Sequence, residues 1–391
     1  MNNRKQGTKA VWGGQSELFY HGSTEVPIVN SVTFGYDNVD DWFDVASGKK
    51  EGHIYSRSTN PTVAVFEEKV RVLENAEAAT SFSTGMAAIS NTLSSLLSRG
   101  DRVVSIKDTY GGTSVLFLEF LPKDGIEVSL CETTNHEEIE AEMKKGCKLL
   151  YLETPTNPTL KILDLKRLIK SAHESGALVV VDNTLATPIN QNPLELGADL
   201  VLHSATKYLG GHSDAMGGVV CGNKDLIQQI FHYREINGAS LHANTAYLLL
   251  RGMQTLELRV LRHNENALRL AEHLQKHKKI EQVFYPGLES HPGHKIASGQ
   301  MTGFGGVLAF SVKGDFDNVK VFLNSLELAH LAASLGSVST LIGPPKVTSH
   351  AETTVEERKQ LGIPENLIRC ALGIENIEDI IADFDQALSK L

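Results

Sequence analysis

The sequence predicts an α/β fold with a mostly parallel sheet, because from about residue 60 short apolar runs alternate with helical patterns. These apolar runs are continuous rather than alternating, which is typical of strands buried on both faces. A long helical stretch from about Ala243 to His277 follows, and shorter strand and helix patterns lie beyond it. We therefore predict an N-terminal arm over residues 1–60, a large domain over 61–250 and a smaller α+β domain over 251–391.

The first elements of the large domain show the alternation clearly. Residues 85–100 (GMAAISNTLSSLLSRG) place apolar side chains at helical spacing and end at Gly100, a residue type that often terminates helices. RVVSI (102–106) and KLLYLET (148–154) then predict buried strands. Asp164 can cap the helix that follows, since an aspartate carboxylate accepts hydrogen bonds from the first turn of a helix.

The later elements follow the same patterns. Three more buried strands are predicted at ALVVVD (177–182), ADLVLHS (198–204) and GGVVC (217–221). Gly252 marks a possible break in the long helical stretch. The smaller domain is predicted from a strand at 304–312, a helix near 315–326, a strand in LIRCALGIEN and a final helix from about Glu378. Residues 1–60 show no clear period and are rich in turn residues, so we predict an extended arm.

Composition and charge exclude several classes of function. The chain has 37 Lys and Arg against 47 Asp and Glu, a net charge of −10, with the acidic residues spread along it. A nucleic-acid partner is not expected, because phosphate contacts need a clustered basic surface. We find no secretory signal and no apolar stretch long enough to span a membrane, so we predict a cytoplasmic protein that does not bind membranes. The four cysteines and fifteen histidines match no disulfide framework or metal-ligand spacing, so no metal is predicted.

Polar residues directly after the apolar runs are the first candidates for chemistry, because ligands of open α/β sheets gather at the carboxyl ends of strands. Asp182 ends ALVVVD, and Ser204, Thr206 and Lys207 end LVLHSATK. A lysine there can be a surface cation, but Lys207 precedes two glycines that leave room for a planar ligand. A desolvated lysine loses its proton readily and can attack an aldehyde. A carboxylate at Asp182 could hold a pyridinium nitrogen protonated, which makes the ring an electron sink.

A third feature is FSTGMAA (82–88), a turn that leads into a helix N-terminus. Free N–H groups and the positive end of the helix dipole suit a phosphate group, and Gly85 lets the backbone approach closely. Alone, this motif is equally consistent with a simple helix cap. The motif gains weight because it occurs together with the lysine and the aspartate.

Longer segments carry a resemblance to a known family. The chain resembles the cystathionine γ-synthase, cystathionine γ-lyase and methionine γ-lyase family of pyridoxal 5'-phosphate enzymes of trans-sulfuration. The resemblance extends from VPIVNSVTF (26–34) to LIRCALGIENIEDIIADFDQAL (367–388), and the matching segments are EGHIYSRSTNPTVAVFEEKV, FSTGMAAI, DTYGGT, YLETPTNPT, residues 180–218 and LLLRGMQTLELR. It implies fold type I, the aspartate aminotransferase-like fold, in which the large domain binds the cofactor.

The resemblance also implies a role for each cofactor residue. Lys207 holds the cofactor as an imine and then shuttles protons, while Tyr110 stacks on the ring and assists proton transfer. Asp182 pairs with the pyridine nitrogen, and Asn157 binds the ring hydroxyl. The phosphate is held by the N–H groups of Gly85 and Met86, by the hydroxyls of Ser204 and Thr206, and by Tyr55 and Arg57 from a neighbouring subunit.

The same resemblance implies which residues bind the substrate. Arg369 binds the substrate carboxylate, a task that suits its planar two-pronged donor geometry. Its position in an apolar strand supports this, since an unpaired charge there would be costly. The family commonly has a glutamate and a serine where this chain has Ser339 and Thr340, which we place near the substrate.

The sequence defines the cofactor more closely than it defines the reaction. We predict γ-replacement or γ-elimination on homoserine-derived amino acids, as in cystathionine γ-synthase and γ-lyase. Methionine γ-lyase and O-acyl-homoserine sulfhydrylase stay open, although Gly112 stands where methionine γ-lyases usually have a cysteine. An aminotransferase or a non-catalytic cofactor-binding protein are alternatives of other classes. The resemblance further implies a homotetramer, built as a dimer of dimers with shared active sites.

Overall fold

The computed structural model describes residues 1, 3–15, 19, 22–348 and 355–391. The chain forms two compact units, each assembled from two segments that lie far apart in the sequence. The first unit contains Met1–Leu96 and Leu202–Thr255, and the second contains Leu97–Val201 and Leu256–Leu391. These units are not continuous stretches of chain, unlike the domains predicted at 1–60, 61–250 and 251–391, which stay a prediction.

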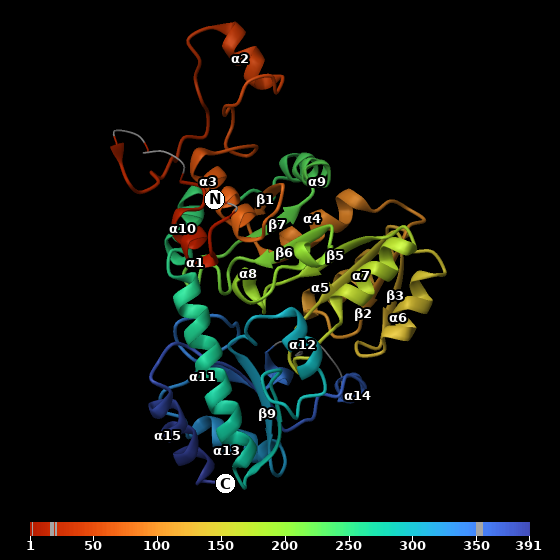
Figure 1. Ribbon diagram of the computed structural model, residues 1–391, viewed down its shortest axis with the longest axis vertical. Coiled ribbons are helices and arrows are strands. Elements are labelled where there is room, and N and C mark those ends of the chain that lie inside the picture. The colour runs from red at the N-terminus through yellow and green to blue at the C-terminus, as the bar shows by residue number, and fades with distance from the viewer. Residues whose placement is uncertain (2, 16–18, 20–21, 349–354) are drawn as a thin grey trace. The chain divides into compact units, whose positions relative to one another are not determined.

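The first unit is built around a short sheet. Strand β1 (Ala78–Phe82) pairs antiparallel with β7 (Gly218–Gly222), and β6 (Leu200–Ser204) is next to β7 in the strand order. Helix α3 packs against β1 and α10, while α4 packs against α9 (Figure 1). The bounds of these helices are Pro61–Leu73 for α3, Gly85–Leu96 for α4, Lys224–Asn237 for α9 and Ala243–Met253 for α10.

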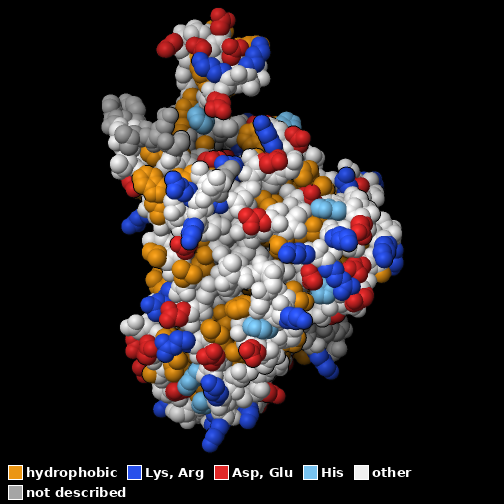
Figure 2. Space-filling model, in the orientation of Figure 1, with side chains coloured by type: hydrophobic (Ala, Val, Ile, Leu, Met, Phe, Trp, Pro, Cys, Tyr) orange, Lys and Arg blue, Asp and Glu red, His pale blue; other side chains and the backbone are white. Residues whose placement is uncertain are grey.

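The predicted extended arm contains two helices that were not expected, α1 (Gln6–Trp12) and α2 (Val39–Ala46). The buried Lys69 side chain donates to the carbonyls of Ala10 and Val11 at the end of α1, so a distant residue stabilises this helix. Burial lowers the pKa of Lys69 to about 8. Helix α2 contains no buried residue and projects from the rest of the first unit (Figure 1), with acidic and basic side chains on the face shown in Figure 2.

Gly252, which marked a possible break in the helical stretch, lies inside α10. A Cβ atom at this position would lie 2.1 Å from the carbonyl oxygen of Gly210, so glycine is required by close backbone packing rather than by a turn. The helical stretch is interrupted two residues later, between the end of α10 at Met253 and the start of α11 (Leu256–Lys276).

The second unit contains four parallel strands in the order β5-β4-β2-β3. Their bounds are Leu178–Asp182 for β5, Leu149–Glu153 for β4, Arg102–Ile106 for β2 and Glu127–Cys131 for β3. Helices α6 (His136–Met143) and α7 (Leu165–Glu174) pack on them. Strands β2, β4 and β5 are buried as their continuous apolar runs predicted, whereas β3, which was not predicted, is only partly buried. Asp164 caps α7 by accepting from the Arg167 N–H at 3.0 Å, as predicted.

A second, mostly antiparallel sheet in the same unit has the order β10-β11-β12-β9-β8. The strands are β8 (Ile280–Phe284), β9 (Val307–Val312), β10 (His330–Leu331), β11 (Leu341–Gly343) and β12 (Leu367–Ala371). It is covered by α11, α13 (Phe316–Asn324) and α15 (Ile377–Leu388). Phe310, Phe322 and Phe384 are fully buried against one another, and each contributes about 1.5–3 kcal/mol by burial.

The remaining helices are short. They are α5 (Gly111–Val115), α8 (Thr187–Asn190), α12 (His294–Gln300) and α14 (Val355–Gln360), with single turns at Leu116–Phe120, Pro193–Leu196 and Pro345–Val347. Each strand named in the sequence analysis is present, with ends shifted by a few residues, and the predicted helix at 85–100 ends at Leu96, before Gly100. Within the described residues, no helix combines the length and apolar character that a membrane crossing requires.

Candidate active site

Within the first unit, the structure brings Gly85 and Ser204 into direct contact. A Cβ atom on Gly85 would lie 2.7 Å from Cβ and 2.8 Å from Oγ of Ser204, so only glycine allows the start of α4 to approach the end of β6 this closely. Thr84 caps α4, because its hydroxyl and carbonyl accept from the Ala87 and Ala88 N–H groups. The described part of the chain contains no acceptor for the N–H groups of Gly85 and Met86.

These two N–H groups are hydrogen-bond donors of the kind that binds a phosphate group. Donors at a helix N-terminus, together with the helix dipole, stabilise an anion. The Ser204 hydroxyl lies beside them because of the Gly85 contact. The donor set therefore fits the phosphate of the predicted cofactor.

Thr206 lies in the turn after β6 and is half-buried. Its hydroxyl donates to the Gly217 carbonyl at 3.2 Å and accepts from the Gly217 N–H at 3.0 Å. A hydroxyl has one proton, so a hydrogen bond to phosphate would require Thr206 to give up its bond to the carbonyl. Its phosphate role stays a prediction.

Lys207 follows in the same turn and is half-buried. Its N–H donates to the Ser204 carbonyl at 3.1 Å, and its carbonyl accepts from the Gly211 N–H at 2.8 Å. Gly211 has a φ of +75°, which glycine adopts without steric cost. The backbone of Lys207 is thus held on both sides by a tight turn, which fixes the point from which the side chain extends.

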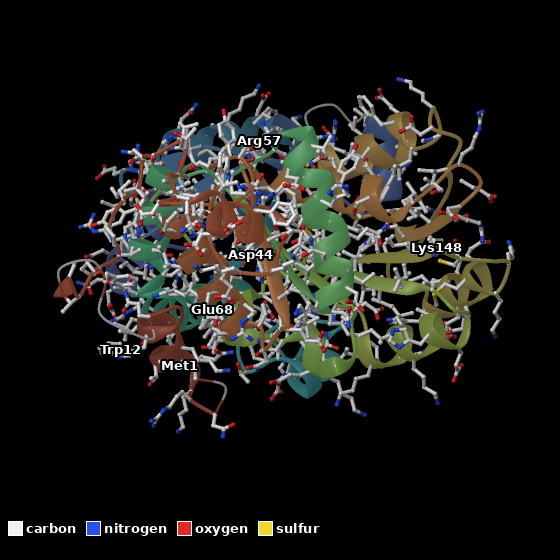
Figure 3. All side chains as sticks on the ribbon, turned by 90° about the horizontal axis from the view of Figure 1, so that it is seen from above. Met1, Trp12, Asp44, Arg57, Glu68 and Lys148 are labelled. Atoms are coloured by element: carbon white, nitrogen blue, oxygen red, sulfur yellow. The ribbon has the colours of Figure 1, made fainter. Side chains whose placement is uncertain are left out.

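Tyr55 and Arg57 also lie together, on the exposed surface of the first unit (Arg57 is labelled in Figure 3). The Arg57 guanidinium carbon is 5.2 Å from the centre of the Tyr55 ring. The Arg57 Nε donates to the Glu235 carbonyl at 3.0 Å, and the Arg57 carbonyl accepts from Ser240. Both side chains are therefore available to a ligand or to another molecule at the surface.

Within the second unit, Asp182 and Glu153 end the adjacent strands β5 and β4 and are direct partners in the register. Both are buried, with 7% and 3% of their surfaces exposed. Asp182 accepts from the Thr184 N–H at 3.0 Å and from the Tyr151 hydroxyl at 3.4 Å. Glu153 accepts from the Tyr110 N–H at 2.8 Å. The structure thus connects two predicted cofactor residues, Tyr110 and Asp182, through a carboxyl group that the sequence analysis did not single out.

The surroundings of Glu153 disfavour a negative charge there. Burial, and then the charges of Asp182 and Asp108, raise its pKa well above the ordinary value, and the Tyr110 N–H opposes this only in part. Burial likewise raises the pKa of the Tyr151 hydroxyl. Glu153 ends the run KLLYLE as Asp182 ends ALVVVD, so its position after an apolar strand was a signal in the sequence.

Asn157 and Arg369 meet in the second unit although they lie far apart in the sequence. The Arg369 Nη1 donates to the Asn157 Oδ1 at 3.2 Å, and its Nη2 donates to the Ser334 carbonyl at 2.6 Å. Arg369 is on β12, with 5% of its surface exposed. Ser334 has a φ of +94°, which is uncommon for a residue other than glycine. Two neutral oxygen atoms therefore hold the buried Arg369 guanidinium on β12.

Ser339 and Thr340 precede β11, and they differ in their surroundings. Thr340 is fully buried, and its N–H and hydroxyl donate to the Glu375 carboxylate at 2.6 and 3.0 Å. Its hydroxyl also accepts from the Gly373 N–H at 3.0 Å. Ser339 is half-buried, 3.4 Å from the Ser337 hydroxyl. Glu375 is a residue that sequence reasoning missed, and it anchors the segment that carries Ser339 and Thr340, two of the three predicted substrate residues.

Comparisons with known proteins identify the family of the chain. The sequence model of the Cys/Met metabolism PLP-dependent enzyme family matches residues 7–389. The L-methionine γ-lyase of Fusobacterium nucleatum subsp. polymorphum is 46% identical over 388 residues, 98% of each chain. The chain belongs to the Cys/Met metabolism family of PLP-dependent enzymes. The cystathionine γ-lyase of Dictyostelium discoideum is 42% identical over 391 residues, 100% of this chain and 99% of that protein.

Solved structures of this family share the fold. The cystathionine γ-synthase of Xanthomonas oryzae pv. oryzae, in complex with aminoacrylate and cysteine, has a TM-score of 0.94 and 38% identity, covering 99% of this chain and 98% of that chain. The predictions of family, α/β fold class and PLP-dependent enzyme class are therefore confirmed. The individual site residues stay predictions.

Proposed function

We propose that the protein catalyses carbon–sulfur chemistry at the γ-carbon of homoserine-derived amino acids, with pyridoxal 5'-phosphate held by Lys207. The observation that carries the proposal lies within the first unit. Gly85 at the start of α4 contacts Ser204, and the N–H groups of Gly85 and Met86 have no acceptor among the described residues. Lys207 lies three residues after Ser204 in the same unit. Relatives named methionine γ-lyase and cystathionine γ-lyase support the reaction class.

The cofactor, when bound, withdraws electrons from the substrate and so weakens bonds at its carbon atoms. We assign Lys207 to hold the cofactor and to move protons at substrate carbon atoms through its ε-amino group. Gly85, Met86, Ser204 and Thr206 would hold the phosphate. Tyr55 and Arg57 would add a hydroxyl and a guanidinium from a second subunit.

The residues of the second unit have the chemistry for the ring. An ionised Asp182 would hold a pyridinium nitrogen, and the Asn157 amide would bind the ring hydroxyl. Tyr110, which is 45% exposed at the start of α5, presents a flat surface for stacking and a hydroxyl for proton transfer. These roles rest on the family resemblance, and the burial and hydrogen bonds of Asp182 and Asn157 support them.

A product assay tests the function. The purified protein is incubated with O-acetylhomoserine, O-succinylhomoserine, cystathionine, homocysteine or methionine, each with and without cysteine or sulfide. We expect a γ-substituted amino acid or an oxo acid with ammonia, identified by mass spectrometry. Transfer of the amino group to an oxo acid without cleavage of a γ-bond would instead identify an aminotransferase, and no turnover of any substrate would favour a non-catalytic protein.

Methionine γ-elimination is the second candidate, and one specific observation favours it. The relative with 46% identity over nearly the whole chain is an L-methionine γ-lyase. Gly112 is evidence against this candidate, since it stands where the resemblance implies a cysteine in methionine γ-lyases. Release of an oxo acid and ammonia from methionine alone, faster than from cystathionine, would select this candidate.

Replacement of Arg369 by alanine should weaken amino-acid binding and leave cofactor absorption unchanged, because we assign its charge to the substrate carboxylate. Loss of a desolvated charge pair costs about 2–5 kcal/mol. Affinity is measured by titrating the cofactor absorption with the best substrate from the product assay.

Arg102→Ala is the matched control for this substitution. Arg102 is an ion-paired arginine at the start of β2 in the same unit, and its replacement should leave substrate affinity unchanged. If Arg369→Ala loses the cofactor and keeps its substrate affinity, the assignment of Arg369 is wrong.

We further propose that the N-terminal segment contributes Tyr55 and Arg57 to the active site of a second copy of the chain. Helix α2 exposes Val39, Trp42 and Phe43, with 74%, 51% and 61% of their surfaces accessible. Large apolar side chains in a helix without a buried residue need a partner surface. A homodimer, paired again into a tetramer, would supply it.

A further inference from the structure

The carboxyl groups of Glu153 and Asp182 lie side by side at the ends of two parallel strands. They are register partners, so their side chains leave the same face of the sheet, and adjacent strands are about 4.8 Å apart. Both are almost completely buried. Two ionised carboxylates in such a position repel each other strongly, and one proton shared between them removes the repulsion.

The other charged and titratable groups around Glu153 do not compensate a charge on it. Asp108, which lies two residues after the end of β2, adds a third acidic group. Lys161 is the nearby cation, but its Nζ is 2.9 Å from the Asp108 carboxylate, and Thr133 also donates to Asp108. The Tyr151 hydroxyl donates to the Asp182 carboxylate at 3.4 Å. Asp108 therefore has a cationic partner, whereas the contact that the described residues give Glu153 is the Tyr110 N–H.

We propose that Glu153 is a positioning residue that works as a neutral carboxylic acid, holding the Tyr110 backbone through its carbonyl oxygen and leaving Asp182 as the anion of the pair. This inference rests on the proposed function, in which Tyr110 and Asp182 contact the cofactor. A neutral acid can accept the Tyr110 N–H without competing with Asp182 for a cationic ring nitrogen. Burial and the neighbouring acidic groups raise the pKa of Glu153, and so they also favour the neutral acid.

Infrared spectroscopy tests the protonation state directly. A neutral carboxylic acid absorbs at a higher C=O frequency than a carboxylate, and glutamate labelled with ¹³C at its side-chain carboxyl shifts only glutamate bands. We expect the full-length protein at pH 7, with and without pyridoxal 5'-phosphate, to show one glutamic-acid band that is lost in Glu153→Gln. Glu132→Gln is the matched control, because Glu132 follows β3 of the same sheet and contacts Lys161 at 3.5 Å. The band must remain in this control.

The pH dependence of stability gives a second readout. Because the folded-state pKa is raised above the ordinary value of 4.5, the native protein retains a proton that the unfolded chain releases. The free energy of unfolding of the wild type, relative to that of Glu153→Gln, should therefore be independent of pH below 4.5. Between pH 4.5 and the folded-state pKa of Glu153, it should fall as pH rises. In this window the ratio of the two folding constants should change about tenfold per pH unit.

The kcat and KM of Glu153 variants distinguish a positioning role of Glu153 from a merely structural one. Glu153→Gln keeps an oxygen acceptor for the Tyr110 N–H, so its kcat should stay within about twofold of wild type. Glu153→Leu removes the acceptor and should lower kcat, on the order of a hundredfold for a displacement near 1 Å, with little change in KM. Absence of the glutamic-acid band together with a flat stability ratio from pH 5 to 8 would overturn the inference. Because neither readout requires turnover, failure of the proposed function is seen separately in the product assay.

Discussion

Replacement of Lys207 by alanine is expected to abolish turnover while the protein still binds pyridoxal 5'-phosphate non-covalently. The ε-amino group is the assigned proton carrier, and general acid–base catalysis alone contributes about 10²–10⁴-fold. The phosphate and ring contacts do not involve this side chain, so cofactor affinity should survive. Turnover is measured by the product assay, and cofactor retention is measured by absorption after gel filtration.

The covalent bond to Lys207 has its own signature. The purified wild type is expected to be yellow, since a lysine–cofactor bond conjugated with the ring absorbs visible light, and borohydride should fix the cofactor on the peptide that contains Lys207. Lys224→Ala is the control, because this lysine lies in the same unit on the exposed first turn of α9. A colourless reconstituted protein, or a labelled peptide without Lys207, would contradict the assignment.

Mixing two inactive variants is expected to restore activity if active sites are shared between subunits. Lys207→Ala and Arg57→Ala chains are each prepared, unfolded together and refolded. In a mixed dimer, one site combines both defects, and the other takes Lys207 from one chain and Arg57 from the other. Random pairing makes half of the dimers mixed, with one intact site of two, so about a quarter of wild-type activity should return.

Arg57 suits this test because its side chain is exposed and its hydrogen bond is to a backbone carbonyl of its own unit. Its loss should therefore not disturb the fold. Arg262→Ala, which removes an exposed arginine of α11 that pairs with Glu265, is unfolded and refolded alone as the control and should keep wild-type activity. If mass spectrometry detects the mixed dimers and the mixture stays as inactive as its parents, Arg57 serves its own chain.

Local patterns in the sequence were sufficient for most of the strands and for the cofactor class. Continuous apolar runs identified the buried strands β2, β4, β5, β6 and β7, because a strand covered on both faces has few polar positions. Polar residues after those runs identified Asp182 and Lys207 as candidates. The strand predictions succeeded because each depends on residues that are neighbours in the chain, and the roles of Asp182 and Lys207 stay predictions.

Contacts between distant residues account for what was missed. Helix α1 depends on the buried Lys69, which lies about sixty residues further along the chain, so no local period revealed it. Gly252 suggested a helix break, but its lack of a side chain serves the close approach of Gly210. Glu375 binds Thr340, which lies 35 residues earlier in the chain. In each case the decisive partner is remote in sequence.

The sequence by itself determined the family, the α/β class and the residue types that suit a pyridoxal-phosphate cofactor, because these follow from local hydrophobic periodicity and from ordered motifs. Only the tertiary structure decided that Glu153 faces Asp182 and binds the Tyr110 N–H, and that Arg369 meets Asn157. The physical reason is that strand register and burial set which charges are neighbours. The energy of a buried charge depends on those neighbours, and local sequence does not specify them.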